Sequence, residues 1–155
     1  MTALKSLLFL LVAPGLVAGY IPLALLRRGP QLETGALAWL AFPLWLIGGV
    51  AILWFFWDFT FKGRGTPAPI DPPKELVASG LYRFVRNPIY VGLVLILIGH
   101  FFYFGYWWLL LYAALCFLVF HLFVTAYEEP TLRTKFGASY EDYLGRVPRW
   151  IPKFK

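Results

Sequence analysis

The sequence predicts an all-α membrane protein with about four transmembrane helices, the last two forming a tight hairpin, and short amphipathic helices at the C-terminus. Sixty per cent of the 155 residues are hydrophobic and only 14% are charged, whereas soluble domains are roughly 45–50% apolar. The apolar residues also gather in four long runs, and a helix needs about 20 residues to cross a bilayer. A soluble chain of this length could not bury so much apolar surface, so lipid must be part of its solvent.

The four predicted spans cover approximately residues 4–26, 36–57, 88–104 and 106–127. Gly105 leaves almost no room between the last two, which predicts the hairpin. We expect the whole chain, residues 1–155, to form a single integral membrane domain.

The N-terminal run allows a second interpretation. Lys5, an apolar stretch and the small residues Val17-Ala18-Gly19 are typical of a secretory signal peptide with its cleavage site. The apolar pattern continues to Leu26, however, which gives full spanning length. We therefore expect a first transmembrane helix.

The distribution of basic residues predicts the orientation. With four spans, the N-terminus, the loop at 58–87 and the tail at 128–155 share one side of the membrane. Of the 14 Lys and Arg residues, all except Arg27 and Arg28 lie on that side. Cytoplasmic loops are enriched in Lys and Arg, so the loop and the tail are predicted to be cytoplasmic.

The net charge of +6 does not indicate a nucleic-acid partner, because the basic residues lie in short segments between apolar runs. Membrane orientation and anionic lipid headgroups explain them better. The single cysteine, Cys116, lies inside an apolar run and excludes a disulfide framework or a zinc cluster, so we expect no metal.

Two polar segments on the predicted cytoplasmic side are candidates for function. Asn87 is a good N-cap and Pro88 a good first helical residue. The free N–H groups of a helix that begins there favour an anionic group, and Arg83 and Arg86 add positive charge. The alternative is that the arginines serve only orientation and that glycines such as Gly92 serve close helix packing. The Gly- and Pro-rich stretch at 62–73 is either a stiff connector or a loop around a site.

Glu128 and Glu129 directly follow the fourth predicted span. Carboxylates at a helix C-terminus oppose the helix dipole, and residues that break a local rule are candidates for function. The alternative is that Pro130 opens a new helix, whose N-terminus would favour them. The tail then repeats apolar residues at helical spacing across a break at Gly137, which predicts amphipathic helices on the membrane surface or on the loop. These apolar residues are Leu132, Phe136, Tyr140, Tyr143, Leu144 and Val147.

These segments combine into one dispersed pattern. It reads Gly80-x-Tyr82-Arg83-x-x-Arg86-Asn87-Pro88-x-Tyr90-x-Gly92, then Glu128-Glu129, then Phe136-Gly137-x-x-Tyr140-x-x-Tyr143-x-x-x-Val147-Pro148. In this order and at these spacings the pattern resembles the isoprenylcysteine carboxyl methyltransferase and phospholipid N-methyltransferase superfamily. The resemblance covers approximately residues 60–155.

The resemblance implies an enzyme that transfers a methyl group from S-adenosylmethionine to a hydrophobic or lipid-like acceptor at the membrane surface, with S-adenosylhomocysteine as product. It implies a cofactor pocket made by the last hairpin, the preceding loop and the tail, without a Rossmann domain. Candidate cofactor-binding residues are Gly80, Tyr82, Arg83, Asn87, Pro88, Tyr90, Gly92, Glu128, Glu129 and Tyr140. Candidate catalytic residues are Arg86, Glu129 and the tail residue Arg146. Asn87 replaces the histidine common in the carboxyl methyltransferases, which leaves the acceptor open.

The nucleophile could be a carboxylate, an amine or a thiol. A carboxylate needs only a positive group to hold it, for which Arg86 and Arg146 are candidates. An amine must lose a proton, which would require Glu128, Glu129 or a tyrosine. With no unambiguous base, the sequence slightly favours an oxygen or sulfur nucleophile.

Two other classes of protein compete with the enzyme. A four-helix transporter of this size requires an acidic residue within a membrane helix, and the first two predicted spans contain none. The second alternative is a non-catalytic membrane scaffold. The sequence does not specify the acceptor or the oligomeric state.

Overall fold

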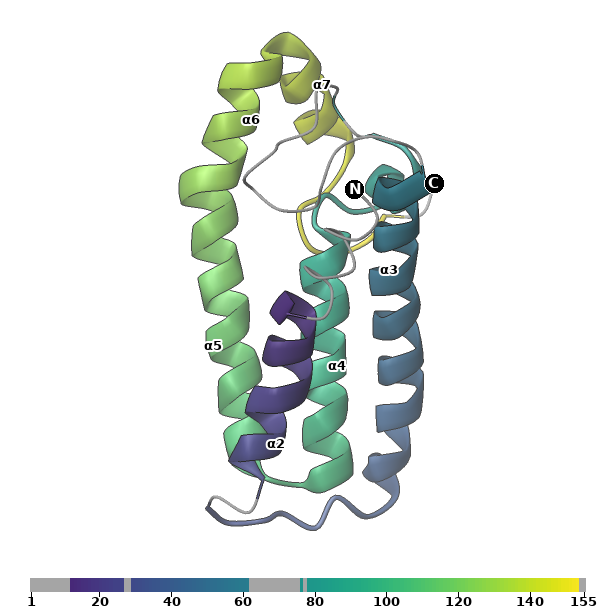
Figure 1. Cartoon of the computed structure of the whole chain (residues 1–155), viewed down its shortest axis with the longest axis vertical. Coiled ribbons are helices and arrows are strands. Elements are labelled where there is room, and N and C mark those ends of the chain that lie inside the picture. Colours follow the sequence, from purple (N-terminus) through teal and green to yellow (C-terminus); the bar gives the residue numbers. More distant parts are fainter. Residues whose placement is uncertain (1–11, 27–28, 62–75, 77, 154–155) are drawn as a thin grey trace.

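The computed structural model describes residues 12–26, 29–61, 76 and 78–153, and its described elements are helices (Figure 1). An isolated bridge between Gln31 and Tyr106 links two connections at one end of the bundle. The elements are η1 (Leu16–Tyr20), α2 (Ile21–Leu25), η2 (Gly35–Leu40), α3 (Ala41–Phe61), η3 (Gly80–Arg83), α4 (Pro88–Phe104), α5 (Trp107–Phe123), η4 (Val124–Glu128), α6 (Glu129–Phe136) and α7 (Ala138–Arg146).

The helices match the apolar runs of the sequence. Gly35–Asp58 and Trp107–Phe136 are long and apolar enough to cross a membrane, and Val12–Leu25 and Pro88–Phe104 are shorter apolar helices. The 17 residues of α4 extend about 26 Å, near the lower limit for a transmembrane helix. Residues 4–11 of the first predicted span, and the Gly- and Pro-rich stretch at 62–73, lie outside the described residues.

The helix that contains the fourth predicted span is longer than that span. The helix does not end at residue 127 but continues through η4 and α6 to Phe136. Pro130 has no N–H group to donate to the preceding turn, and the wider π-helical turn of η4 lies directly before it. About 20 residues cross the hydrocarbon layer, so residues 107–127 suffice to span the membrane. We therefore expect Glu128 and Glu129 to lie beyond the membrane-spanning segment.

The predicted hairpin between α4 and α5 is confirmed. Gly105 ends α4 in the left-handed conformation, with a φ of 72°, and its N–H donates to the carbonyl of Phe101 at 2.8 Å. A Cβ atom at this position would overlap the carbonyl oxygen of Leu32. Only glycine fits this turn without strain.

The interior of the bundle is built around close contact between α3 and α4. Gly48 on α3 and Gly92 on α4 are both buried, and a Cβ atom at Gly92 would lie 2.9 Å from the carbonyl oxygen of Gly48. Ile52, Phe55, Phe56 and Leu93 form a buried cluster beside this contact. Small residues allow such close approach between membrane helices, so Gly92 has the packing role that the sequence offered as the alternative, and its role in cofactor binding stays a prediction.

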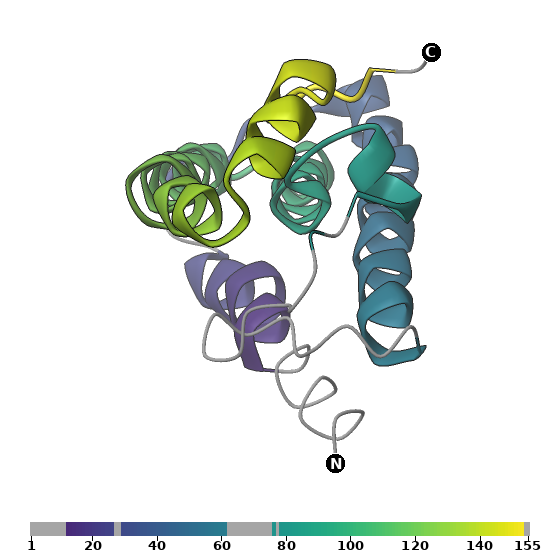
Figure 2. The same ribbon diagram turned by 90° about the horizontal axis from the view of Figure 1, so that it is seen from above.

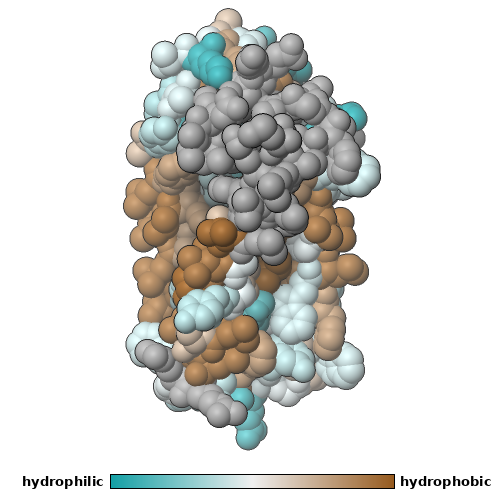
Figure 3. Space-filling view, viewed as in Figure 1, coloured by the Kyte–Doolittle hydropathy of each residue, from teal (hydrophilic) through white to brown (hydrophobic). Residues whose placement is uncertain are grey.

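The outer surface suits a lipid environment. Large apolar side chains are exposed along the helices, including Trp39 at 73% and Leu46 at 67%. The space-filling view shows hydrophobic residues along the middle of the bundle and hydrophilic residues toward its ends (Figure 3). Seen from above, α4 lies between α3 and α5 (Figure 2).

The tail folds as the predicted amphipathic helices. Gly137, with a φ of 51°, separates α6 from α7, and its N–H donates to the carbonyl of Arg133 at 2.9 Å. The apolar face of α7 forms a buried cluster of Tyr140, Tyr143 and Val147 against which Leu76 packs. The tail therefore rests partly on the end of the loop. This is one of the two placements predicted for it, on the membrane surface or on the loop.

Candidate functional site

The C-terminal tail is tied to the segment that precedes α4. The N–H of Arg86 donates to the carbonyl of Pro148 at 2.9 Å, and the hydroxyl of Tyr143 donates to the carbonyl of Tyr82 at 2.8 Å. The side-chain amide of Asn87 donates to the carbonyl of Arg149 at 3.1 Å. Asn87 thus occupies the predicted N-cap position, but its side chain makes no cap hydrogen bond and holds the tail instead.

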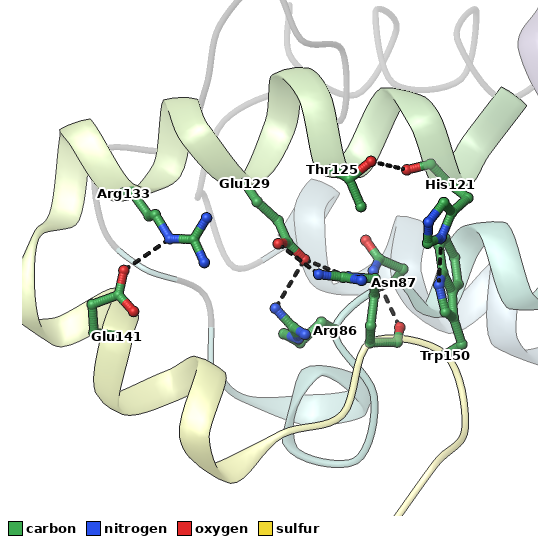
Figure 4. Close-up of polar contacts among 9 residues, drawn as sticks. Arg86, Asn87, His121, Thr125, Glu129, Arg133, Glu141 and Trp150 are labelled. Atoms are coloured by element: carbon green, nitrogen blue, oxygen red, sulfur yellow. Dashed lines mark hydrogen bonds and ion pairs between the residues drawn. The ribbon is translucent and has the colours of Figure 1, made fainter.

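Glu129 joins this tail to the start of α6. Its carboxylate accepts hydrogen bonds from Arg149 Nε at 2.7 Å and Arg149 Nη2 at 2.9 Å, and from Arg86 Nη1 at 2.9 Å (Figure 4). The side chain is only 5% exposed. Burial acts against ionisation of Glu129, but the hydrogen bond from Arg149 and the charges of both arginines outweigh it, so the pKa is lowered. Glu129 is therefore ionised, and it links the segment before α4, the start of α6 and the end of the tail.

Glu128 has a different environment from its neighbour. Its carboxylate accepts a hydrogen bond of 3.4 Å from the hydroxyl of Tyr90 on α4, and Tyr90 stacks on Phe120 with ring centroids 4.8 Å apart. Burial, and less strongly the charge of Glu129, raises the pKa of Glu128 against the effect of this hydrogen bond. Adjacent residues of a helix point about 100° apart, and here the two carboxylates have different partners.

Tyrosines surround the two carboxylates. Burial, together with the negative charge of Glu128, raises the pKa of Tyr82 well above its ordinary value. Tyr140 on α7 is buried near Arg86 and Glu129, and burial is the main cause of its raised pKa. The phenols in this region are therefore neutral at physiological pH.

Three further predicted residues have backbone or packing roles. Gly80 begins η3 with a φ of 63°, and a Cβ atom there would overlap the carboxylate of Asp58. Pro88 is buried in the first turn of α4. Gly92 lies one turn further along α4 and faces Gly48 of α3. These residues position the site without presenting a polar side chain to it.

One polar atom of the site has no hydrogen-bond partner within the described part of the chain. This atom is the buried Nε of Arg86. A buried N–H group without a partner is costly, so a ligand acceptor at this position would be favourable.

Two of the predicted site residues that the structure describes, Arg83 and Arg146, do not contact the paired glutamates. They line a separate pocket of about 320 Å³ with Lys153, and neither contacts Glu128 or Glu129 through a hydrogen bond or ion pair of the described residues. The placement of Arg146 beside the reacting centre stays a prediction.

Sequence reasoning missed Arg149 and Trp150. Arg149 is the bidentate partner of Glu129, and the indole of Trp150 donates to His121 Nδ1 on α5 at 3.3 Å (Figure 4). The sequence did hold one signal for them. Pro148 cannot continue a helix, so α7 ends just before it and the residues that follow are free to turn back toward the other helices.

A family model described as phospholipid methyltransferase matches residues 36–139, about two thirds of the chain. The match spans α3 to α6 and includes Glu128 and Glu129. No curated protein sequence matches the chain. The family match decides for the enzyme over the transporter and the non-catalytic scaffold, and members of this family use S-adenosylmethionine. The chain belongs to the phospholipid methyltransferase family: it is an integral, multi-pass membrane enzyme that transfers a methyl group from S-adenosylmethionine to a lipid acceptor.

Proposed function

We propose that S-adenosylmethionine is held by Glu128, Tyr90, Tyr82 and Arg86, where α4 begins and α5–α6 leaves the membrane. The observation that carries this proposal is the unequal pairing of the two adjacent glutamates. Glu129 is satisfied by two guanidinium groups, whereas among the described residues the carboxylate of Glu128 accepts only the 3.4 Å hydrogen bond from Tyr90. Glu128 is therefore available for a cation, and the cofactor carries an ammonium group.

The residues present fit the rest of the amino-acid part of the cofactor. Its carboxylate needs a donor, and the buried Nε–H of Arg86 has no acceptor among the described residues. A charge-assisted hydrogen bond between a guanidinium and a carboxylate is about twice as strong as a neutral one. Tyr140, next to Arg86, closes this side of the proposed site.

When bound, the cofactor supplies a methyl group that its sulfonium already activates. The protein therefore has to orient the acceptor and exclude water. A carboxylate or thiolate acceptor needs no base. An amine acceptor would need a base, and Glu129 is a weak one, because two arginines lower its pKa and occupy its oxygens. With Glu128 assigned to the cofactor, the proposal keeps the oxygen or sulfur nucleophile that the sequence slightly favoured.

We also propose that the chain forms one domain, with the loop at 58–87 and the tail in the cytoplasm. The end of α3, the start of α4 and the α6–α7 tail lie at one end of the bundle (Figure 1). The tail at 128–155 and residues 83–86, which precede α4, carry eight of the 14 Lys and Arg residues of the sequence, which supports the positive-inside orientation. S-adenosylmethionine is made in the cytoplasm, so this orientation gives it direct access to the site.

Calorimetric titration of the purified full-length protein with S-adenosylhomocysteine tests the proposed site. We expect saturable binding that the Glu128→Gln substitution weakens by about tenfold, because one charge-assisted interaction is lost. Glu141→Gln is the matched control, because Glu141 is an exposed carboxylate on α7 that pairs with Arg133. Equal affinity of the Glu128→Gln variant and the wild type would exclude Glu128 from the site.

A further inference from the structure

A pocket of about 320 Å³ lies where the tail crosses the segment before α4. Two parts of the chain that are far apart in the sequence contribute three cations to it: Arg83 comes from η3, and Arg146 and Lys153 both come from the tail. The hydrogen bond from the main-chain N–H of Lys153 to the carbonyl of Phe84, 3.0 Å long, fixes the edge where the tail meets this segment. The other described lining residues are Ala78, Phe84, Tyr143 and Val147.

The three cations are not neutralised within the described part of the chain. The guanidinium of Arg83 lies 5.9 Å from the ring centroid of Phe84, and Arg146 Nε donates to the main-chain carbonyl of Asp142 at 3.2 Å. Neither these arginines nor Lys153 forms an ion pair with a described carboxylate. Like charges gathered around one pocket repel each other, and a bound anion would reverse that cost.

The position of the pocket indicates where the anion comes from. Arg83 lies five residues before Pro88, at which α4 begins, so the pocket is near the level of the lipid headgroups. Phe84, Tyr143 and Val147 add apolar surface to its lining. A free phosphate would use only the cations, whereas the glycerol carbons of a phospholipid would also contact this apolar surface.

We propose that this pocket binds the phosphate of an anionic phospholipid headgroup at the cytoplasmic membrane surface, outside the cofactor site. Guanidinium groups match the geometry of phosphate oxygens, and basic groups near the membrane attract anionic lipids. The lipid in this pocket need not be the methyl acceptor, and the proposal does not depend on the cofactor site proposed above.

The test is a titration of the purified full-length protein in detergent with three compounds. Dihexanoyl phosphatidic acid carries phosphate and glycerol but no nitrogen that could be methylated. Dihexanoyl phosphatidylcholine is zwitterionic, and inorganic phosphate lacks the glycerol. We expect phosphatidic acid to bind at least about tenfold more tightly than either of the others. Equally tight binding of phosphate would mean a soluble ligand, and equally tight binding of phosphatidylcholine would mean apolar contact alone; both results overturn the proposal.

Reversal of one charge in the pocket tests whether phosphatidic acid binds there. Lys153→Glu should weaken phosphatidic acid binding by about tenfold. Lys135→Glu, an equal charge change on α6 outside the pocket, should change it by less than about twofold. Equal losses in both variants would indicate diffuse attraction and contradict a built pocket.

Two further measurements separate this pocket from the cofactor site. Arg146→Gln should weaken phosphatidic acid binding as well, because a second cation of the pocket is removed. The Lys153→Glu variant should bind S-adenosylhomocysteine as tightly as the wild type does. A parallel loss of that binding would assign the cations to the cofactor site and overturn the proposal.

Discussion

Arg149 donates two parallel hydrogen bonds to the carboxylate of Glu129, at 2.7 and 2.9 Å, across 20 residues of sequence. Arg86 donates a third at 2.9 Å to the same carboxylate. One buried anion therefore holds together the start of α4, the start of α6 and the end of the tail. Loss of this contact should release the tail, because the other described hydrogen bonds between tail and helices are single and neutral.

Substitution of Arg149 by Lys should loosen the tail although the charge is kept. An ammonium group cannot make the bidentate contact with Glu129. We expect faster amide hydrogen exchange over residues 147–153, measured by mass spectrometry. Arg133→Lys is the control, because Arg133 makes a single hydrogen bond to the exposed Glu141, and such pairs contribute about 0–1 kcal/mol. Identical exchange in the two variants would contradict the role of the Glu129 contact in holding the tail.

Glu129→Gln should lower both the stability of the protein and its affinity for S-adenosylhomocysteine. Removal of one partner of a buried ion pair costs about 3–5 kcal/mol, and we expect the lower end because the Arg149 side chain is 31% exposed. Affinity should fall by about tenfold, since Arg86 loses the group that orients it. Thermal unfolding in detergent and calorimetry measure the two effects. Unchanged calorimetric affinity would remove Glu129 from any role in the cofactor site.

The lowered pKa of Glu129 predicts a loss of stability at acidic pH. A carboxylate whose pKa is lower in the folded state stabilises the fold above its unfolded pKa of about 4.3. This contribution disappears as the pH falls through the lower, folded pKa. The difference in melting temperature between the wild type and Glu129→Gln should therefore be constant near neutral pH and shrink below about pH 4.3. A difference that does not change down to pH 3 would contradict the assignment.

Much of the fold could be predicted from the sequence, because lipid-facing helices consist of long apolar runs and end at clear signals. The predicted span 88–104 coincides with α4, bounded by Pro88 and Gly105. The span predicted to end at residue 127 stays a prediction, but the helix itself continues beyond it, because an apolar run marks where a helix leaves the membrane and not where the helix ends. The π-helical turn before Pro130 carries the helix onward.

The candidate site was less predictable, because sequence order does not specify which way a side chain points. The sequence treated Glu128 and Glu129 as a pair, yet one contacts Tyr90 and the other Arg86 and Arg149. Asn87 has the residue type and position of an N-cap, but its amide binds the tail, which lies 62 residues away. Such long-range partners depend on how the tail folds back, and no local pattern encodes that.

Substitution of Gly92 by Ala should separate its packing role from cofactor binding. A Cβ atom there would lie 2.9 Å from the carbonyl oxygen of Gly48, so α3 and α4 must move apart. We expect a loss of about 1–3 kcal/mol, measured by thermal unfolding in detergent. Gly49→Ala is the matched control, because no heavy atom lies within 4 Å of a Cβ there, and alanine favours a helix by up to about 1 kcal/mol. A Gly92→Ala variant that melts with the wild type but binds S-adenosylhomocysteine weakly would contradict the packing role and return Gly92 to the cofactor site.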